Sequence, residues 1–253
     1  MAGLDWARRR QTVYAIVVVI TLVGLTALGW YVFVYAPPTC SDNIINQGEG
    51  GVDCGGPCAR LCVAPRVDAQ WTRPVKVADG VYHGVALVKN PLADATGTAI
   101  EYQLSLYDAG NILIAAREGT FDVLPGQTRT LFEANIITGS RVPVRAFTII
   151  NNGAWRTAEP VEVPLAIVTQ ELDQEALTLT ATIENTSART VNRIVADALL
   201  YNSDNVLIAA SETKVASLSG RERKEISFTW SIPFSSPVAR ADIELRIDDA
   251  PRP

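Results

Sequence analysis

The hydrophobic pattern of the chain changes once, from an unbroken apolar stretch near the N-terminus to short alternating segments over the rest of its length. No Asp, Glu, Lys or Arg occurs from Gln11 to Ser41, and Val13–Tyr35 is almost wholly apolar. At about 1.5 Å per helical residue this stretch reaches about 35 Å, enough to cross a hydrocarbon core of about 30 Å. We therefore predict a single transmembrane helix over 13–35.

Basic residues beside this stretch predict its orientation. Three arginines, Arg8, Arg9 and Arg10, precede it, and the first basic residue after it is Arg60. Because basic residues accumulate on the cytoplasmic side of a membrane, we predict a cytoplasmic stub over 1–12 and extracytoplasmic domains in a single-pass protein of the cell membrane. A cleaved signal peptide is the alternative, but the apolar run is too long and no small-x-small site follows it.

Beyond Val67, apolar and polar residues alternate in short runs that are bounded by turn residues. In Ile100–Leu106, apolar residues alternate with Glu101, Gln103 and Ser105, which predicts a strand with one buried face. Such runs, without helical periodicity, predict an all-β region made of sandwiches. The other strands expected in its first half are Trp71–Val77, Val81–Asn90, Ile112–Ala116, Thr128–Ile136 and Ala146–Asn151.

The alternating region contains an internal repeat. LYDAGNILIAAREGTFDVLPGQ at 106–127 aligns without a gap with LYNSDNVLIAASETKVASLSGR at 200–221, an offset of 94 residues. A period of this size corresponds to one sandwich domain. We therefore predict two tandem immunoglobulin-like β-sandwiches, over 66–159 and 160–253, joined near Trp155–Pro164.

The repeat also assigns side chains to the core or to the outside. His83 falls between two inward positions, so it is predicted to point away from the core of its own sandwich. The inward positions of an early strand in the two copies are Tyr82, Gly84, Ala86, Val88 and Leu177, Leu179, Ala181, Ile183. Those of a later strand are Phe132, Ala134, Ile136 and Ile226, Phe228, Trp230.

In each copy a strand ends in Leu-Tyr-Asp or Leu-Tyr-Asn and is followed by a polar turn and an apolar strand. This pattern, carried by Leu106–Asp108 and Leu200–Asn202, resembles the FxLYD family of immunoglobulin-like domains on exported bacterial and archaeal proteins. Leu104 and Ala198 stand where that family has Phe. The order of anchor, neck and tandem domains also resembles uncharacterised single-pass membrane proteins of uncultured small-genome bacteria, through GVYHGVALVKNP, LFEANIITGSRVP and FTWSIPF. The resemblance implies a fold and no catalytic residues.

A cysteine-rich neck is predicted over 36–65, where Pro37 and Pro38 end the helix and the glycine-rich sequence cannot build a core. An even number of cysteines in an exported segment predicts two disulfides. Sequence neighbours are the preferred partners among three connectivities, and a four-thiolate zinc site is the alternative. The preferred pairs are Cys40 with Cys54 and Cys58 with Cys62.

Oxygen-bearing side chains are concentrated in the same neck. Asp42, Asn43, Glu49 and Asp53 lie within twelve residues of one another and could supply ligands to Ca²⁺. Their spacing differs from that of an EF-hand loop. A polar, glycine-rich turn is the alternative interpretation.

Charge and residue inventory exclude several classes of function. The net charge is −5, and the part after the apolar stretch is near −7 because Asp5 and three arginines precede it, so nucleic acid is not an expected partner. The single histidine, His83, is on an outer face, and the sequence contains no G-x-S-x-G, H-E-x-x-H or P-loop motif. We predict no catalytic residues, no cofactor and no small-molecule substrate.

The sequence therefore favours a membrane-anchored, extracytoplasmic interaction or envelope-structural protein that is not an enzyme. Its partner would be a protein or an envelope polymer, met by strand edges and by loops such as Leu92–Thr98 and Thr186–Asn192. A pilin-like filament subunit is an alternative, although the helix has no early acidic residue and no processing site precedes it. An accessory subunit of a membrane machine is another alternative.

Overall fold

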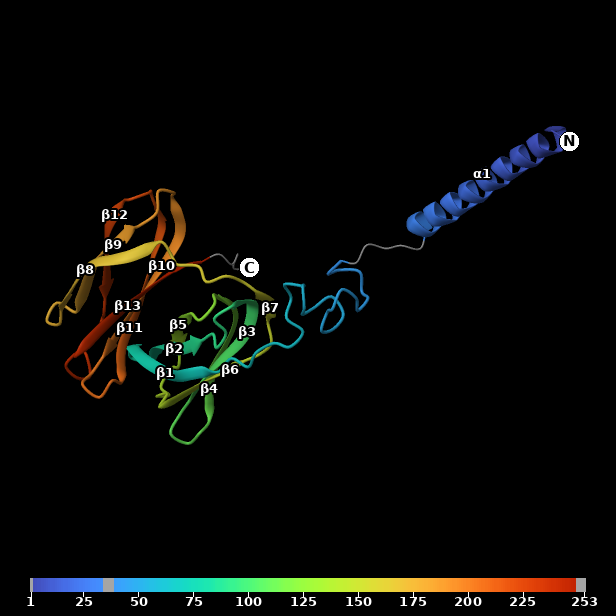
Figure 1. The fold of residues 1–253 in the computed structure, drawn as a ribbon. Helices are drawn as coiled ribbons and strands as arrows, with labels where there is room; N and C mark the ends of the chain where they lie inside the picture. Colours follow the sequence, from blue (N-terminus) through green and yellow to red (C-terminus); the bar gives the residue numbers. More distant parts are fainter. Residues whose placement is uncertain (1, 34–38, 249–253) are drawn as a thin grey trace. The chain divides into compact units, whose positions relative to one another are not determined.

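The computed structural model describes residues 2–33 and 39–248 (Figure 1). The chain divides into two compact units, Met1–Cys58 and Ala59–Pro253. The first unit contains the helix α1 and most of the neck, and the second contains all of the described strands.

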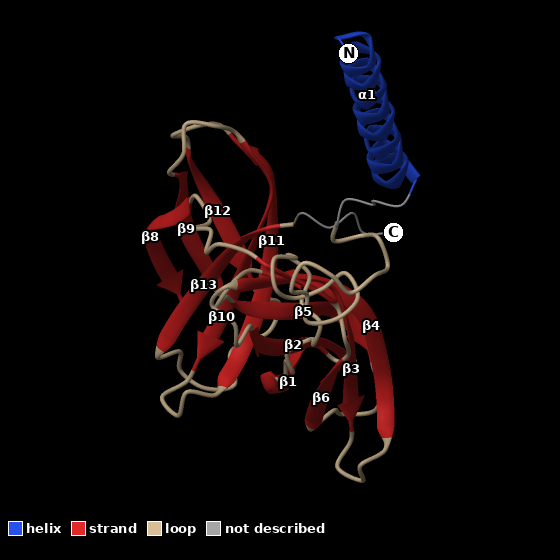
Figure 2. Cartoon of the chain, turned by 45° about the vertical axis from the view of Figure 1, so that its right-hand side comes forward, coloured by secondary structure: helices blue, strands red, loops and turns tan. Residues whose placement is uncertain are grey.

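α1 (Ala2–Phe33) is the only α-helix of the described residues (Figure 2). Within it, Arg8–Val32 is long and apolar enough to span a membrane, and its side chains are exposed on all sides. An all-round apolar surface distinguishes this helix from the one-sided stripe of a helix that packs on a soluble core. The helix begins eleven residues before the predicted span. The predicted end at Tyr35 and the prolines Pro37 and Pro38 lie outside the described residues.

The first sandwich consists of two antiparallel sheets, as the alternating sequence predicts. One sheet has the order β1-β2-β5, with β1 (Ala69–Ala78), β2 (Val81–Lys89) and β5 (Thr128–Ile137). The other has the order β4-β3-β6, with β4 (Leu113–Val123), β3 (Ala95–Tyr107) and β6 (Arg145–Ile150), and β7 (Ala154–Thr157) pairs with the beginning of β3.

The second sandwich repeats this topology except for β7, which has no counterpart among its described strands. One sheet has the order β12-β9-β8, with β8 (Leu165–Asp173), β9 (Thr178–Asn185) and β12 (Arg223–Thr229). The other has the order β11-β10-β13, with β10 (Val191–Tyr201), β11 (Leu207–Leu218) and β13 (Arg240–Ile247). The fold is thus all-β, with two tandem sandwiches after one N-terminal helix, as predicted.

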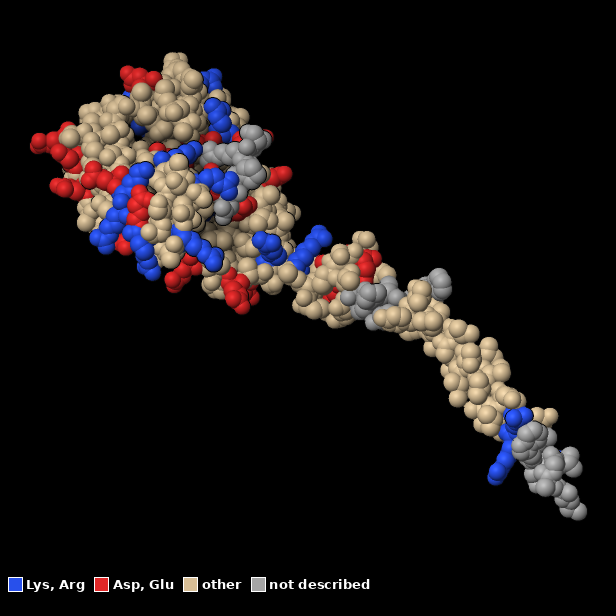
Figure 3. Space-filling view, turned by 90° about the horizontal axis from the view of Figure 1, so that it is seen from above, with Lys and Arg blue, Asp and Glu red and all other residues tan. Residues whose placement is uncertain are grey.

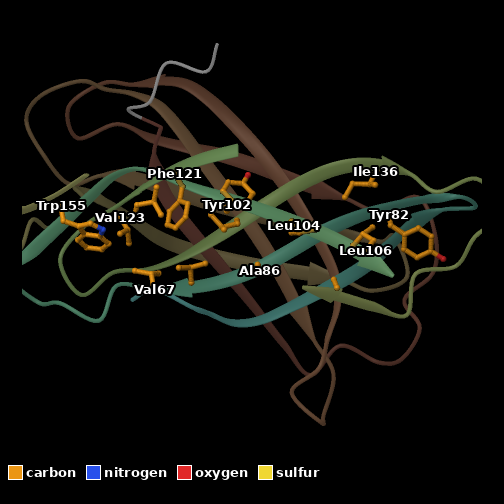
Figure 4. Close-up of a cluster of buried hydrophobic side chains, with 14 of the residues drawn as sticks. Val67, Tyr82, Ala86, Tyr102, Leu104, Leu106, Phe121, Val123, Ile136 and Trp155 are labelled. Carbon is orange, nitrogen blue, oxygen red and sulfur yellow. The ribbon is translucent and has the colours of Figure 1, made fainter. Parts of the chain in front are cut away.

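Each sandwich has its own hydrophobic core. In the first, Leu104, Leu106 and Phe121 are almost completely buried between the sheets (Figure 4). Gly84 is an inward position at which a Cβ atom would lie 2.4 Å from the Leu104 side chain, so a larger residue would force that side chain to move. In the second core, Leu179 and Phe228 are buried to the same degree.

The predicted inward set of β5 is wrong at two positions. Leu131 points into the first core, whereas Phe132 points out of it and Ala134 is exposed. The cause is an irregularity in the pairing of β2 with β5 between Tyr82 and Gly84, which shifts the register by one residue. A one-residue shift exchanges the two faces of a strand.

A buried asparagine fixes the same corner in both sandwiches. The Asn90 side-chain amide donates to the carbonyls of Ala95 and Leu124, at 2.8 Å each. Asn185, which is fully buried, donates likewise to the carbonyls of Leu218 and Arg189. The Asn185-Thr186-Ser187 sequence matches the glycosylation pattern, but the amide nitrogen of Asn185 is committed to these bonds in the folded chain.

Candidate functional site

The four cysteines form two disulfides, but the pairs are not the predicted ones. Cys40 is bonded to Cys58, with 5.6 Å between their Cα atoms, and the two other cysteines, Cys54 and Cys62, are also disulfide-bonded. Gly55 and Gly56 adopt positive φ angles and reverse the chain, so Cys58 meets the segment at Cys40. The thiolates that a zinc site would need are consumed by these bonds.

The predicted calcium residues are held by backbone hydrogen bonds. The Asp53 carboxylate accepts from the backbone amides of Asp42 and Asn43, and the Asp42 carboxylate accepts from the amide of Ile44 at 2.9 Å. A bond from the Asn46 side chain is the largest of the hydrogen bonds that lower the pKa of Asp42. The carboxylates therefore act as caps of a compact turn, and the binding of Ca²⁺ stays a prediction.

Glu49 is the most buried acid of the neck. One of its carboxylate oxygens lies 3.0 Å from the Cys58 sulfur, and the other lies 3.4 Å from the backbone nitrogen of Asn46. The nearby sulfurs of Cys40 and Cys58 are joined to each other, so this grouping offers only one free ligand, the carboxylate.

The end of the neck is part of the first sandwich. The Leu61 amide donates to the Trp155 carbonyl at 2.9 Å, and the Thr157 amide donates to the Ala59 carbonyl. Leu61 and Val67 pack against the first core. These contacts attach the neck to β7 by backbone bonds that do not depend on a particular side chain.

The two sandwiches are joined by a third buried cluster, which we call the junction. The sheet β11-β10-β13 of the second sandwich packs through its outer face on the outer face of β1-β2-β5 (Figure 1). The first sandwich contributes Val75, Val85, Trp71 and Phe132, and the second contributes Leu199, Tyr201, Leu207 and Ala210. The Trp71 and Tyr201 rings meet edge to face, 6.5 Å apart.

Charged side chains lie beside the apolar part of the junction. Arg246 donates to both Asp197 and Glu212, the latter at 2.9 Å, and both Arg246 and Asp197 are buried. Glu244 crosses to the first sandwich and accepts from the Thr130 amide at 2.9 Å and from the Thr130 hydroxyl at 2.6 Å. The junction is therefore fixed by directional polar contacts as well as by apolar packing.

Burial changes the ionisation of these acids. Desolvation raises the pKa of Asp197 to about 8, although the guanidinium of Arg246 opposes this rise. Desolvation also raises the pKa of Glu244, against the hydrogen bond from Thr130. These groups lie on the outer faces of their strands, as the alternation predicts, but the other sandwich covers them.

His83 lies at the border of the junction rather than in an open cleft. Its Nδ1 accepts from the Asn135 backbone amide at 3.0 Å, and its ring packs against Phe132 with 4.8 Å between centroids. Burial lowers the pKa of His83 to about 4, although the charge of Glu212 acts in the opposite direction. A neutral, half-buried imidazole with a backbone partner has a packing role here.

A cleft of about 570 Å³ opens at the edge of the junction. Trp71, Arg73, Tyr201 and Arg240 are among its lining residues, and Arg240 lies 4.4 Å over the Tyr201 ring. Its described lining contains no His, Cys or Lys. The cleft thus offers aromatic and polar contacts, without a paired nucleophile and base.

One of the two predicted contact loops is largely a strand. β3 begins at Ala95, and Ala95 and Thr96 are buried because this part of β3 pairs with β7. In the other loop, β10 begins at Val191, so only 186–190 lies outside the strands. The exposed loop surface is correspondingly smaller than predicted.

Sequence reasoning missed the junction, although one signal for it exists. The run IVADALLY at 194–201 is almost continuously apolar, and every one of these residues is buried. A strand with one buried face alternates apolar and polar residues. A continuous apolar run is typical of a strand that is buried on both faces. Asp197 is the single charge within it.

No protein-family model matches the sequence, and no curated protein matches it.

Proposed function

We propose that the chain is a membrane-anchored, extracytoplasmic interaction or envelope-structural protein without catalytic activity. The observation that carries the proposal is the order of its parts: an exposed apolar helix of membrane-spanning length, disulfide-bonded cysteines directly after it, and sandwiches beyond. Disulfides persist in oxidising compartments, and this supports placing everything after the helix outside the cytoplasm.

The surface and the buried polar groups support binding rather than turnover. On the face drawn in Figure 3, basic and acidic side chains are interspersed over the sandwiches, without a large basic area for a phosphate backbone. The groups with the most perturbed pKa values, Asp197 and His83, pack inside the junction or at its border. Strand edges and outer sheet faces are then the surfaces for a protein or envelope-polymer partner.

Topology is tested by single cysteines and a membrane-impermeant maleimide on intact cells, or on spheroplasts where an outer membrane is present. Ser203→Cys in the second sandwich should react without permeabilisation, and Ala2→Cys in the stub should react only after it. The native cysteines are disulfide-bonded and should stay silent. Reaction of Ala2→Cys alone would contradict the proposed orientation. Replacing Arg8, Arg9 and Arg10 with Glu should increase the fraction of chains in the opposite orientation, in which Ala2→Cys reacts without permeabilisation and Ser203→Cys does not.

A further inference from the structure

One outer sheet face of the first sandwich exposes large apolar side chains. On the β4-β3-β6 face, Phe147 is 53% exposed and Ile149 is 60% exposed. The Tyr107 ring lies beside Phe147, with 5.7 Å between centroids. These residues alternate with inward ones along their strands, so they form one continuous patch. Apolar patches on exported domains often mark interaction surfaces.

In the second sandwich, the face that corresponds to this one is covered by another domain. In the second sandwich the corresponding β11-β10-β13 face is the one that the junction buries. Strand pairing places Tyr107 opposite Arg145 and Tyr201 opposite Arg240, so Phe147 and Ile149 correspond to Asp242 and Glu244. The same architectural face is thus covered in one copy and uncovered and more apolar in the other.

The chain itself offers few faces that could cover the patch. The β1-β2-β5 face, which covers the second sandwich, is already occupied in the junction. In the second sandwich the counterpart of that face is the outer face of β12-β9-β8. Its central strand, β9, presents the polar residues Thr178, Thr180 and Thr182, which alternate with inward core residues. Among the outer sheet faces of the two described sandwiches, the apolar complement is then the same β4-β3-β6 face of a second copy.

The charges on this face suit a two-fold pairing. Arg145 lies at the Tyr107 end, whereas Glu101 and Glu118 lie toward the opposite end, where they help to line a hollow of about 480 Å³. A two-fold axis that runs across the strands near Leu104 would place Arg145 of one copy over the Glu101 end of the other. It would also bring Phe147 of one copy opposite Ile149 of the other.

We propose that the β4-β3-β6 face of the first sandwich is a self-association surface, on which two copies of this chain pair face to face. The contact has an apolar centre with opposite charges at its two ends, an arrangement that fixes register as well as affinity. An isologous contact of this kind closes on itself, so it yields a dimer and no filament.

The first experiment measures the oligomeric state of the full chain in detergent micelles or nanodiscs, by light scattering over a concentration series. The wild type should form a dimer, and Phe147→Glu should remove it. Ile137→Glu, which alters a residue that is 76% exposed outside the patch, is the matched control and should leave the dimer intact. Circular dichroism checks that each variant is folded. A monomer at every concentration, or a dimer that Phe147→Glu does not weaken, would overturn the proposal.

The second experiment tests the two-fold register by charge reversal. Arg145→Glu and Glu101→Arg should each weaken the dimer by on the order of tenfold, because like charges then meet at both ends of the contact. The double variant restores opposite charges and should regain most of the affinity. If the single variants weaken the dimer and the double variant stays weak, the proposed register is wrong.

Discussion

At the scale of single residues, the half-buried His83 shows how position changes the behaviour of an ordinary side chain. The alternation of its strand places it outside its own core, where its ring packs against Phe132 of the same sandwich at the border of the junction. Its Nδ1 accepts a backbone hydrogen bond, which requires that this nitrogen be unprotonated. The neutral form is therefore the one that fits the folded chain.

Because His83 is the only histidine, its titration can be followed directly by NMR of the imidazole protons. The midpoint should lie near pH 4 in the folded chain and near the ordinary value of 6.5 in the unfolded chain. The neutral imidazole then contributes stability that is present above about pH 6.5 and is lost as pH falls toward 4.

His83→Gln is the matched variant, since its amide oxygen can still accept the hydrogen bond from Asn135. As pH falls from about 6.5 to about 4, the unfolding free energy of the wild type should fall relative to that of this variant, which has no imidazole to protonate. A folded-state midpoint near 6.5 would contradict the expected burial effect.

At the scale of elements, β10 carries the most demanding environment in the molecule. It is buried on both faces from Ile194 to Tyr201, and Asp197 is the one charged residue of that stretch. Arg246 on β13 and Glu212 on β11 flank Asp197, so three neighbouring strands share one buried ionic cluster.

Above about pH 8, where Asp197 is ionised, Arg246→Met should destabilise the chain by about 3–5 kcal/mol, because it leaves the buried Asp197 carboxylate without its cation. Glu212, which is half-buried, keeps its ion pair with Lys214. Arg223→Met is the control: it removes the more exposed ion pair with Glu184 and should cost less than about 1 kcal/mol. Both values are measurable by denaturant unfolding with tryptophan fluorescence.

The pH dependence of the Arg246→Met variant follows from the raised pKa of Asp197. The guanidinium of Arg246 opposes the rise of the Asp197 pKa, so its removal should raise that pKa further, and the variant should lose stability relative to the wild type as pH rises from about 7 to about 9. An equal loss at both pH values would show that the charge of Asp197 is not what Arg246 compensates.

Sequence pattern predicted most elements because local alternation and the repeat both report on the same physical constraint, a strand with one buried face. The apolar helix and the strands of the first sandwich other than β7 followed from it, and the repeat extended the same pattern to the second copy. Phe132 was misassigned because a local irregularity in pairing leaves no mark in composition. The disulfide partners were misassigned because Gly55 and Gly56 reverse the chain, which separation along the sequence does not reveal.

The site was less predictable than the fold for a related reason. A pattern along one strand shows which side chains face outward, but it does not show whether another domain covers that side. Asp197, Arg246 and His83 were all assignable to outer faces. Their surroundings depend on residues far away in the sequence: Thr130 of the first sandwich bonds Glu244 beside the Arg246 cluster, and the charge of Glu212 on the second sandwich acts on His83 of the first.

At the scale of the whole molecule, the two sandwiches have separate cores and a shared junction. A fragment that begins at Val161 should fold, because the second core is complete within it. Its unfolding free energy should be lower than that of the same sandwich in the full chain, since Leu199, Tyr201 and Leu207 lose their apolar partners.

The comparison is made by denaturant unfolding of the fragment and of the full chain, with a dye that binds exposed apolar surface as a second signal. The fragment should bind the dye more strongly than the full chain. Leu199→Ala in the fragment should then cost less than it does in the full chain. Equal stability of the fragment and the full chain would mean that the junction contributes nothing.

The Cys40–Cys58 disulfide sets the reach of the neck. Between these two cysteines, before the residues that are bonded to β7, a reduced chain could extend to about 60 Å, at about 3.4 Å per residue. In the oxidised chain the same two Cα atoms are 5.6 Å apart. The oxidation of two sulfur atoms therefore shortens the reach of this segment about tenfold.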